Sequence, residues 1–154
     1  MERLKGIKGA IFDLDGTLLD SMGIWGEIDR RFLERRGIEL PEDYIDAMKF
    51  MEFNRAAEYT IRRFGLDETP EALMAEWTQM SRDAYAREIE LKPGVRACLA
   101  RLAQAGVKIA AATSCTQELF VPALKRGGVY DLFSAFATTA VAGVGKHSPA
   151  VFLL

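Results

Sequence analysis

The chain has 154 residues, of which 49% are hydrophobic and 27% charged, and its formal net charge is −2. This composition predicts a packed globular core rather than a disordered chain, and the near-neutral charge argues against a nucleic-acid-binding protein. No hydrophobic run is long enough to span a membrane, and the two cysteines form no disulfide framework of the secreted kind. We therefore expect a cytoplasmic protein that binds neither nucleic acid nor membrane.

The first expected element is a strand over residues 7–14, a short apolar run that ends in a glycine-containing turn. From residue 22 to residue 87 the spacing of apolar residues is helical and predicts three or four helices with no strand. Gly65 is expected to end one of these helices, and Pro70 to open the next. Because this block is too long for a simple crossover connection, it predicts an inserted domain.

Strands and helices alternate in the rest of the chain. A helix that starts at Pro93 precedes an expected strand over residues 107–112, and a helix over residues 116–126 precedes a third strand over residues 136–139. This alternation predicts an α/β fold with a Rossmann-like parallel sheet and right-handed crossovers. The expected domains are a discontinuous Rossmann-like core, residues 1–19 and 88–154, and an inserted α-helical cap, residues 20–87.

Polar side chains follow each of the three expected strands. Those side chains are Asp13 at the end of the first strand and Asp15 two residues on, Thr113 and Ser114 directly after the second, and Lys146 after the third. Ligands of open parallel sheets bind beyond the carboxyl ends of the strands. We therefore expect these five residues to meet in one crevice.

The acid pair is suited to phosphoryl transfer. An ionised carboxylate such as Asp13 can attack phosphorus and form an aspartyl-phosphate, and a second acid such as Asp15 can protonate the leaving oxygen. Two acids this close repel each other unless a cation lies between them. Mg²⁺ prefers oxygen ligands and would also neutralise phosphate charge, so the acid pair predicts a magnesium cofactor.

Five further residues are candidates for binding the phosphate: Gly16, Thr17, Thr113, Ser114 and Lys146. Gly16 permits a tight turn, hydroxyl groups can donate hydrogen bonds, and a lysine supplies positive charge. Each feature also has an ordinary interpretation, because Asp-Gly is a common turn, Thr-Ser can cap a helix and a lone lysine is usually solvated. Because the acid pair, the hydroxyl groups and the lysine occur in this order at successive strand ends, a phosphate-binding site is favoured over these ordinary interpretations.

The run Ile11-Phe12-Asp13-Leu14-Asp15-Gly16-Thr17-Leu18 resembles the first motif of the haloacid dehalogenase-like (HAD) hydrolase superfamily, in its β-phosphoglucomutase-like phosphatase subgroup. Residues 109–114 resemble the second motif, and Gly145-Lys146 with Pro149 resembles the third. The resemblance implies that Asp13 is the nucleophile and Asp15 the general acid/base. It also implies that Thr113 and Lys146 bind phosphate, and that the Asp13 carboxylate and the Asp15 main-chain carbonyl bind Mg²⁺.

Three departures from the family pattern qualify this resemblance. The third motif has Ala150 where the family has an acid, and Trp25 stands near the position of the cap histidine of sugar-phosphate mutases. The acidic fourth motif is absent from the 154 residues. We therefore expect a sheet that is incomplete at the C-terminus, with the first strand at its edge. A fragment, a short gene product, a partner chain or self-association through that edge would each account for this.

The leading hypothesis is a Mg²⁺-dependent phosphatase, a phosphoric monoester hydrolase that acts on a small phosphorylated metabolite. One alternative is an inactive HAD-like chain that serves as a binding or interaction protein, and another is a fragment of a sugar-phosphate mutase. A true dehalogenase is disfavoured because the resemblance assigns Asp15 to the phosphatase type of site. The sequence does not specify the substrate.

Overall fold

A computed structural model of the chain describes residues 6–49 and 51–154 and divides into two compact units. The first unit runs up to Met22 and continues from Tyr85 to Leu154, and the second is Gly23–Ala84. The junctions between these units fall after Met22 and before Tyr85. The second junction lies inside a continuous helix, so chain connectivity alone does not mark it.

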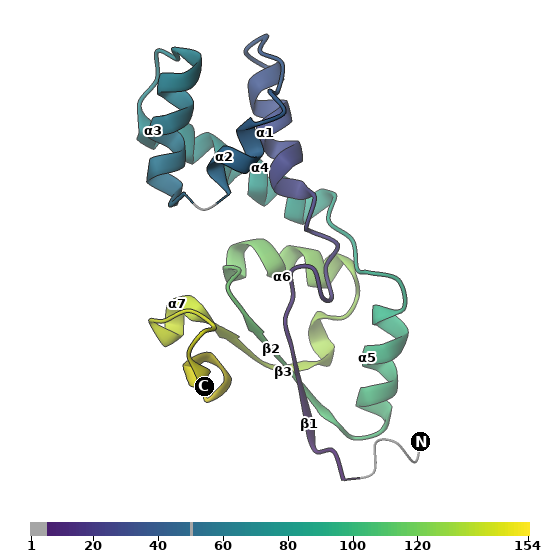
Figure 1. Cartoon of the computed structure of the whole chain (residues 1–154). Helices are drawn as coiled ribbons and strands as arrows, with labels where there is room; N and C mark the ends of the chain where they lie inside the picture. Colours follow the sequence, from purple (N-terminus) through teal and green to yellow (C-terminus); the bar gives the residue numbers. More distant parts are fainter. Residues whose placement is uncertain (1–5, 50) are drawn as a thin grey trace. The chain divides into compact units, whose positions relative to one another are not determined.

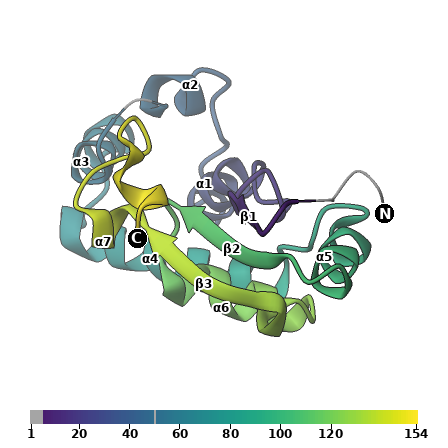
Figure 2. The same cartoon turned by 90° about the horizontal axis from the view of Figure 1, so that it is seen from below.

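The first unit is built on three parallel strands in the order β1-β2-β3 (Figures 1 and 2). The strands are β1 (Gly9–Phe12), β2 (Lys108–Thr113) and β3 (Phe133–Thr138). In the paired register Phe12 lies opposite Ala111, and Thr113 lies opposite Thr138. The carboxyl ends of all three strands therefore reach the same edge of the sheet. The predicted α/β class with a partial Rossmann-like sheet is confirmed.

Helices precede and follow the second and third strands of this unit. They are α5 (Val95–Gln104), α6 (Gln117–Arg126) and α7 (Thr139–Ala142), with short 3-10 helices at Tyr130–Leu132 and Pro149–Phe152. The third strand was expected over residues 136–139, but it begins at Phe133 and ends at Thr138. It ends there because the Thr138 hydroxyl accepts a hydrogen bond from the Val141 amide at 3.3 Å and caps α7.

Burial differs sharply between the central and the outer strand. In β2 the residues Ile109, Ala111 and Thr113 are almost fully buried, and they join a core that includes Leu99 and Phe120. In β1, Ile11 keeps 52% of its surface exposed. Within the described residues β1 pairs with β2 alone, as the sequence led us to expect for the first strand.

The second unit is helical, and no strand occurs among its described residues. Its helices are α1 (Ile24–Glu34), α2 (Tyr44–Met48), α3 (Phe53–Phe64) and most of α4 (Pro70–Arg87). The rings of Phe32 and Trp77 meet edge to face with their centroids 5.6 Å apart, and the hydroxyls of Tyr44 and Thr60 are hydrogen-bonded at 2.6 Å. No helix in the described part of the chain has the length and hydrophobicity needed to cross a bilayer.

Candidate active site

The loop that follows β1 is a tight turn held by main-chain hydrogen bonds. The Leu14 carbonyl accepts from the amides of Leu18 and Leu19, each at 2.9 Å, and the Gly16 amide donates to the Leu19 carbonyl at 2.9 Å. Gly16 has φ +73°, a conformation that residues with a Cβ rarely adopt. Leu14 and Leu19 are fully buried, so the turn is anchored in the core. The side chains of Asp13 and Asp15 flank the buried Leu14 in sequence.

Asp13 is paired with a cation. Its Oδ1 forms an ion pair with the Lys146 ammonium and accepts a hydrogen bond from the Leu14 amide at 2.9 Å. The two side chains are partly open to solvent, with 42% of the Asp13 side chain and 28% of the Lys146 side chain exposed. The first and third sequence motifs, 133 positions apart, therefore meet at the carboxyl edge of the sheet.

Asp15 has a different environment, made of hydroxyl groups. Its Oδ1 accepts hydrogen bonds from the Ser21 hydroxyl at 2.7 Å and from the Tyr85 hydroxyl at 2.6 Å. Both donor residues are almost fully buried, with 2% of Ser21 and 1% of Tyr85 exposed. The buried Cys115 side chain interacts with both Asp15 and Tyr85. Asp15 is therefore surrounded by groups that can donate hydrogen bonds.

The groups around Asp15 remain uncharged at neutral pH. Burial raises the pKa of the Tyr85 hydroxyl far above its usual range, and its hydrogen bond to Asp15 raises it further. Burial also raises the pKa of the Cys115 thiol to about 12, with a further contribution from the charge of Asp15. Both groups therefore keep their protons, so neither adds a second negative charge beside Asp15.

The end of β2 supplies a further hydroxyl. Thr113 is fully buried, and its Oγ1 accepts a hydrogen bond from the Cys115 amide at 3.0 Å. Because the oxygen acts as acceptor in that bond, its proton can be donated to a ligand oxygen. Ser114 and Thr17 are exposed, and within the described residues their side chains make no hydrogen bond. The fold thus holds Thr113 firmly and leaves the other two hydroxyls free to reorient.

Sequence reasoning expected Asp13, Asp15, Thr113 and Lys146 at or after strand ends. In the structure Asp13 follows β1 and Thr113 ends β2, whereas Lys146 lies beyond both β3 and the short helix α7 and reaches back to Asp13. Sequence reasoning did not identify Tyr85 or the contact of Ser21 with Asp15. Cys115, which follows the end of β2, is buried. No local pattern marks Tyr85, which is a buried residue near the end of α4.

The oxygen ligands at this edge suit a magnesium ion. Mg²⁺ commonly binds one or two carboxylates and completes its shell with waters and substrate phosphate oxygens. The half-open Asp13 carboxylate and the Asp15 main-chain carbonyl fit that description. Across residues 6–49 and 51–154, no cluster of three or more histidine, cysteine or acidic side chains could hold a metal by itself. A preformed all-protein cage of that kind is therefore absent from the described residues.

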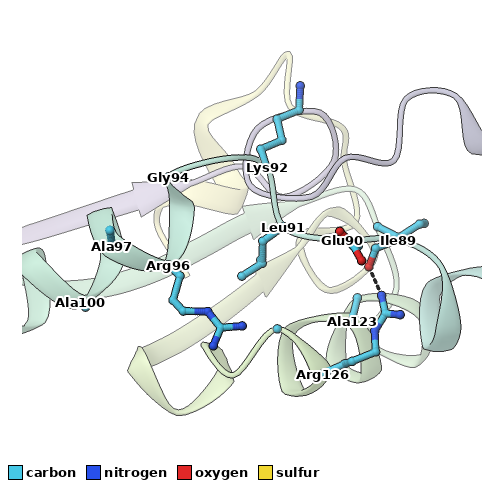
Figure 3. A pocket seen from close by; sticks show the side chains of 11 residues that line it. Ile89, Glu90, Leu91, Lys92, Gly94, Arg96, Ala97, Ala100, Ala123 and Arg126 are labelled. Atoms are coloured by element: carbon cyan, nitrogen blue, oxygen red, sulfur yellow. Dashed lines mark hydrogen bonds between the residues drawn. The ribbon is translucent and has the colours of Figure 1, made fainter.

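A cavity of about 710 Å³ lies elsewhere in the first unit, between the start of α5, the end of α6 and the segment 89–94 (Figure 3). Arg96 extends toward it from α5 and Arg126 from α6, whereas Lys92 points away. The Arg126 guanidinium donates to the main-chain oxygen of Ile89. None of the predicted site residues lines the cavity. Arg126 thereby contacts segment 89–94, whose residues 90–92 pair through main-chain hydrogen bonds with residues 18–20 after β1.

Comparison with known proteins adds a family match. A model of the family described as haloacid dehalogenase-like hydrolase matches residues 10–153. A protein named "Phosphoglycolate phosphatase" from Yersinia pseudotuberculosis is 31% identical over 163 residues, and the match covers 100% of this chain and 68% of that protein. "Putative phosphatase YhcW" from Bacillus subtilis is 30% identical, and the match covers 96% of this chain and 67% of that protein. The chain thus spans about two thirds of the length of these relatives.

Solved structures share the fold. A "putative beta-phosphoglucomutase" from Thermotoga maritima superposes with a TM-score of 0.86 at 22% identity, covering 96% of this chain and 68% of that one. The magnesium-bound "putative HAD-hydrolase YfnB" from Bacillus subtilis superposes with a TM-score of 0.74 at 16% identity, covering 96% of this chain and 71% of that one. At these identities the likeness establishes the architecture of the chain.

Proposed function

Because the chain belongs to the haloacid dehalogenase-like hydrolases, we propose that it is a Mg²⁺-dependent phosphatase that hydrolyses a small phosphorylated metabolite through an aspartyl-phosphate on Asp13. The observation that carries the proposal is the ion pair between Asp13 and Lys146 at the edge where the strands end. It joins the first and third motifs at the sheet edge where β2 ends in the buried Thr113. The relatives named as phosphatases support the same reaction class.

In the first half of the reaction, an Asp13 carboxylate oxygen forms a bond to phosphorus as the bond from phosphorus to the ester oxygen breaks. The departing oxygen takes a proton from the Asp15 carboxyl group and leaves as an alcohol. Asp13 is suited to the nucleophilic role because its side chain is 42% exposed, so a phosphate can reach it.

In the second half, a water oxygen forms a bond to phosphorus and loses a proton to the Asp15 carboxylate. The bond from phosphorus to Asp13 then breaks, which releases inorganic phosphate and restores the Asp13 carboxylate. Asp15 thereby recovers the proton that it gave to the alcohol, and the cycle is balanced.

Positive charge is needed because an anionic nucleophile approaches an anionic phosphate. Lys146 supplies one charge directly, and the Thr113 hydroxyl can donate to an equatorial phosphate oxygen. The Asp13 carboxylate and the Asp15 main-chain carbonyl would hold Mg²⁺, which supplies further charge neutralisation when it is bound. The names of the relatives point to phosphoglycolate as a first substrate to assay.

The test is phosphate release from 2-phosphoglycolate and p-nitrophenyl phosphate by the purified chain, with Mg²⁺ and with excess EDTA. We expect Asp13→Asn to lower kcat/KM on the order of 10³-fold or more, because the amide is not a competent nucleophile. The matched control is Asp131→Asn, which removes an exposed acid from the same unit and should leave the rate unchanged. Equal rates for the wild type and Asp13→Asn, or no Mg²⁺-dependent release at all, would contradict the proposal.

A further inference from the structure

The carboxylate of Asp15 accepts both of its side-chain hydrogen bonds from Ser21 and Tyr85 on a single oxygen atom. Two buried hydroxyl groups, those of Ser21 and Tyr85, donate to the same oxygen of its carboxylate, Oδ1, at 2.7 and 2.6 Å. Neither hydroxyl engages the other oxygen, Oδ2. Two donors on one oxygen fix the rotation of the carboxylate about its Cβ–Cγ bond more tightly than one donor could. They also make the two oxygens chemically different.

The fold delivers the two donors from segments far apart in sequence. Residues 18–20 pair with residues 90–92, through hydrogen bonds from the Lys92 amide to the Leu18 carbonyl and from the Asp20 amide to the Glu90 carbonyl, both at 2.9 Å. Ser21 directly follows one of these segments, and Tyr85, in the last turns of α4, precedes the other. This main-chain pairing therefore brings the backbone of Ser21 close to the segment that follows Tyr85.

We propose that Tyr85 and Ser21 are positioning residues that hold Asp15 through Oδ1, so that Oδ2 is the oxygen that transfers the proton to the leaving group. This inference rests on the proposed phosphatase function and extends it. Neither hydroxyl touches the substrate. Their contribution is to keep Oδ2 at one place and one orientation, since a proton donor must lie within hydrogen-bond reach of the leaving oxygen.

The same arrangement defines the class of substrate that benefits from it. An alkyl phosphate releases a strongly basic alkoxide and needs a proton as its bond to phosphorus breaks. p-Nitrophenyl phosphate releases a weakly basic phenolate that leaves without one. A well-positioned Asp15 therefore favours esters of ordinary alcohols over esters of acidic phenols. A site built in this way is directed at alkyl phosphates, the chemical class to which 2-phosphoglycolate belongs.

The experiment compares kcat/KM for 2-phosphoglycolate and for p-nitrophenyl phosphate in Tyr85→Phe, which keeps the ring and removes the donor. Because kcat/KM reports steps up to the release of the leaving group, it isolates the proton donation. We expect a loss of about 10- to 100-fold for 2-phosphoglycolate and of less than about threefold for p-nitrophenyl phosphate. Ser21→Ala should give the same pattern, because it removes the other donor to Oδ1.

The ratio of the two kcat/KM values is independent of the amount of correctly folded protein, so partial unfolding of a variant does not obscure the result. Tyr130→Phe is the matched control, since Tyr130 stacks on Phe136 in the same unit, and its ratio should equal that of the wild type. Equal losses on both substrates, or no loss, in Tyr85→Phe would overturn the inference and leave the proposed function intact. Failure of Asp13→Asn to abolish both activities would overturn the proposed function and this inference with it.

Discussion

Asp13 and Asp15 lie two positions apart on one turn, yet their surroundings are opposite. Asp13 is half open to solvent and paired with the Lys146 ammonium, whereas Asp15 is held by buried, uncharged hydroxyl groups. An open carboxylate beside a cation can be reached by an anionic phosphate. An enclosed carboxylate held by neutral donors can bind and release a proton at a fixed place. Environment, more than sequence position, therefore separates the two roles that we propose for them.

The largest effect among the following changes should come from removing the cation beside Asp13. Lys146→Met keeps most of the side-chain length and deletes the charge, so kcat/KM should fall on the order of 10²–10³-fold. The loss should be similar for 2-phosphoglycolate and p-nitrophenyl phosphate, because both carry the same phosphate charge. Steady-state kinetics on both substrates would check this, with Lys146→Arg as the variant that keeps the charge. A loss confined to 2-phosphoglycolate would contradict the distinction between the two acids.

A third acid, Asp29, shows how burial changes the pKa of a carboxyl group that accepts no hydrogen bond from a hydroxyl of the described residues. Asp29 lies in α1 of the second unit, and within the described residues its carboxylate accepts no hydrogen bond. Burial raises the pKa of Asp29 from 3.8 to about 7. The folded protein therefore holds this proton up to about pH 7, whereas the unfolded chain releases it near pH 4. It follows that the stabilising effect of this proton is present below pH 4 and is lost as pH rises toward 7.

We therefore expect Asp29→Asn to raise the free energy of unfolding by about 2 kcal/mol at pH 8 and to change it little near pH 4. Urea unfolding of the wild type and the variant at both pH values would measure the difference. If the difference in free energy of unfolding between Asp29→Asn and the wild type were the same at pH 4 and pH 8, burial would not raise the pKa of Asp29 in the folded protein. The matched control is Asp46→Asn, which replaces an exposed acid of the same unit.

The smallest expected effect concerns the turn that separates Asp13 from Asp15. Gly16 has φ +73°, and an added Cβ would lie 2.8 Å from the Met22 sulfur. The Met22 side chain is exposed and can move, so the cost of Gly16→Ala should come mainly from the backbone conformation, about 1 kcal/mol. Thermal unfolding would measure it, with Gly23→Ala as control because an added Cβ meets no atom there. A Gly16→Ala protein as stable as the wild type would exclude strain in this turn.

The parts of the site that follow from local sequence were predictable. Asp13 directly follows β1 and Thr113 ends β2, and alternating strands and helices are enough to bring such residues to one edge. Lys146 lies beyond α7, in the loop that follows the third strand. The helical character of residues 23–84 was equally readable, because apolar spacing and breakers are local signals. The start of β3 was expected at residue 136, but the strand begins at Phe133. The earlier start was missed because β3 follows directly on the 3-10 helix Tyr130–Leu132, with no turn residues between them.

The environment of Asp15 was not predictable in the same way. Tyr85 is 70 positions from Asp15, and the contact depends on the pairing of residues 18–20 with residues 90–92. That pairing is a main-chain contact between two irregular segments and has no side-chain signature. Ser21 falls within the expected cap, residues 20–87, and no sequence signal indicated that its side chain would contact Asp15. Sequence therefore led us to propose roles for the two acids, and the structure was needed to show which groups contact them.

The most direct test of the central claim is to identify the phosphorylated residue. The purified chain would be mixed with Mg²⁺ and 2-phosphoglycolate, quenched during turnover and treated with borohydride, which reduces an acyl phosphate to an alcohol. Mass spectrometry of the peptides would then locate the reduced side chain. The account predicts reduction at Asp13 in the wild type and none in Asp13→Asn. Turnover with reduction at another acid, or with no reduced side chain, would contradict it.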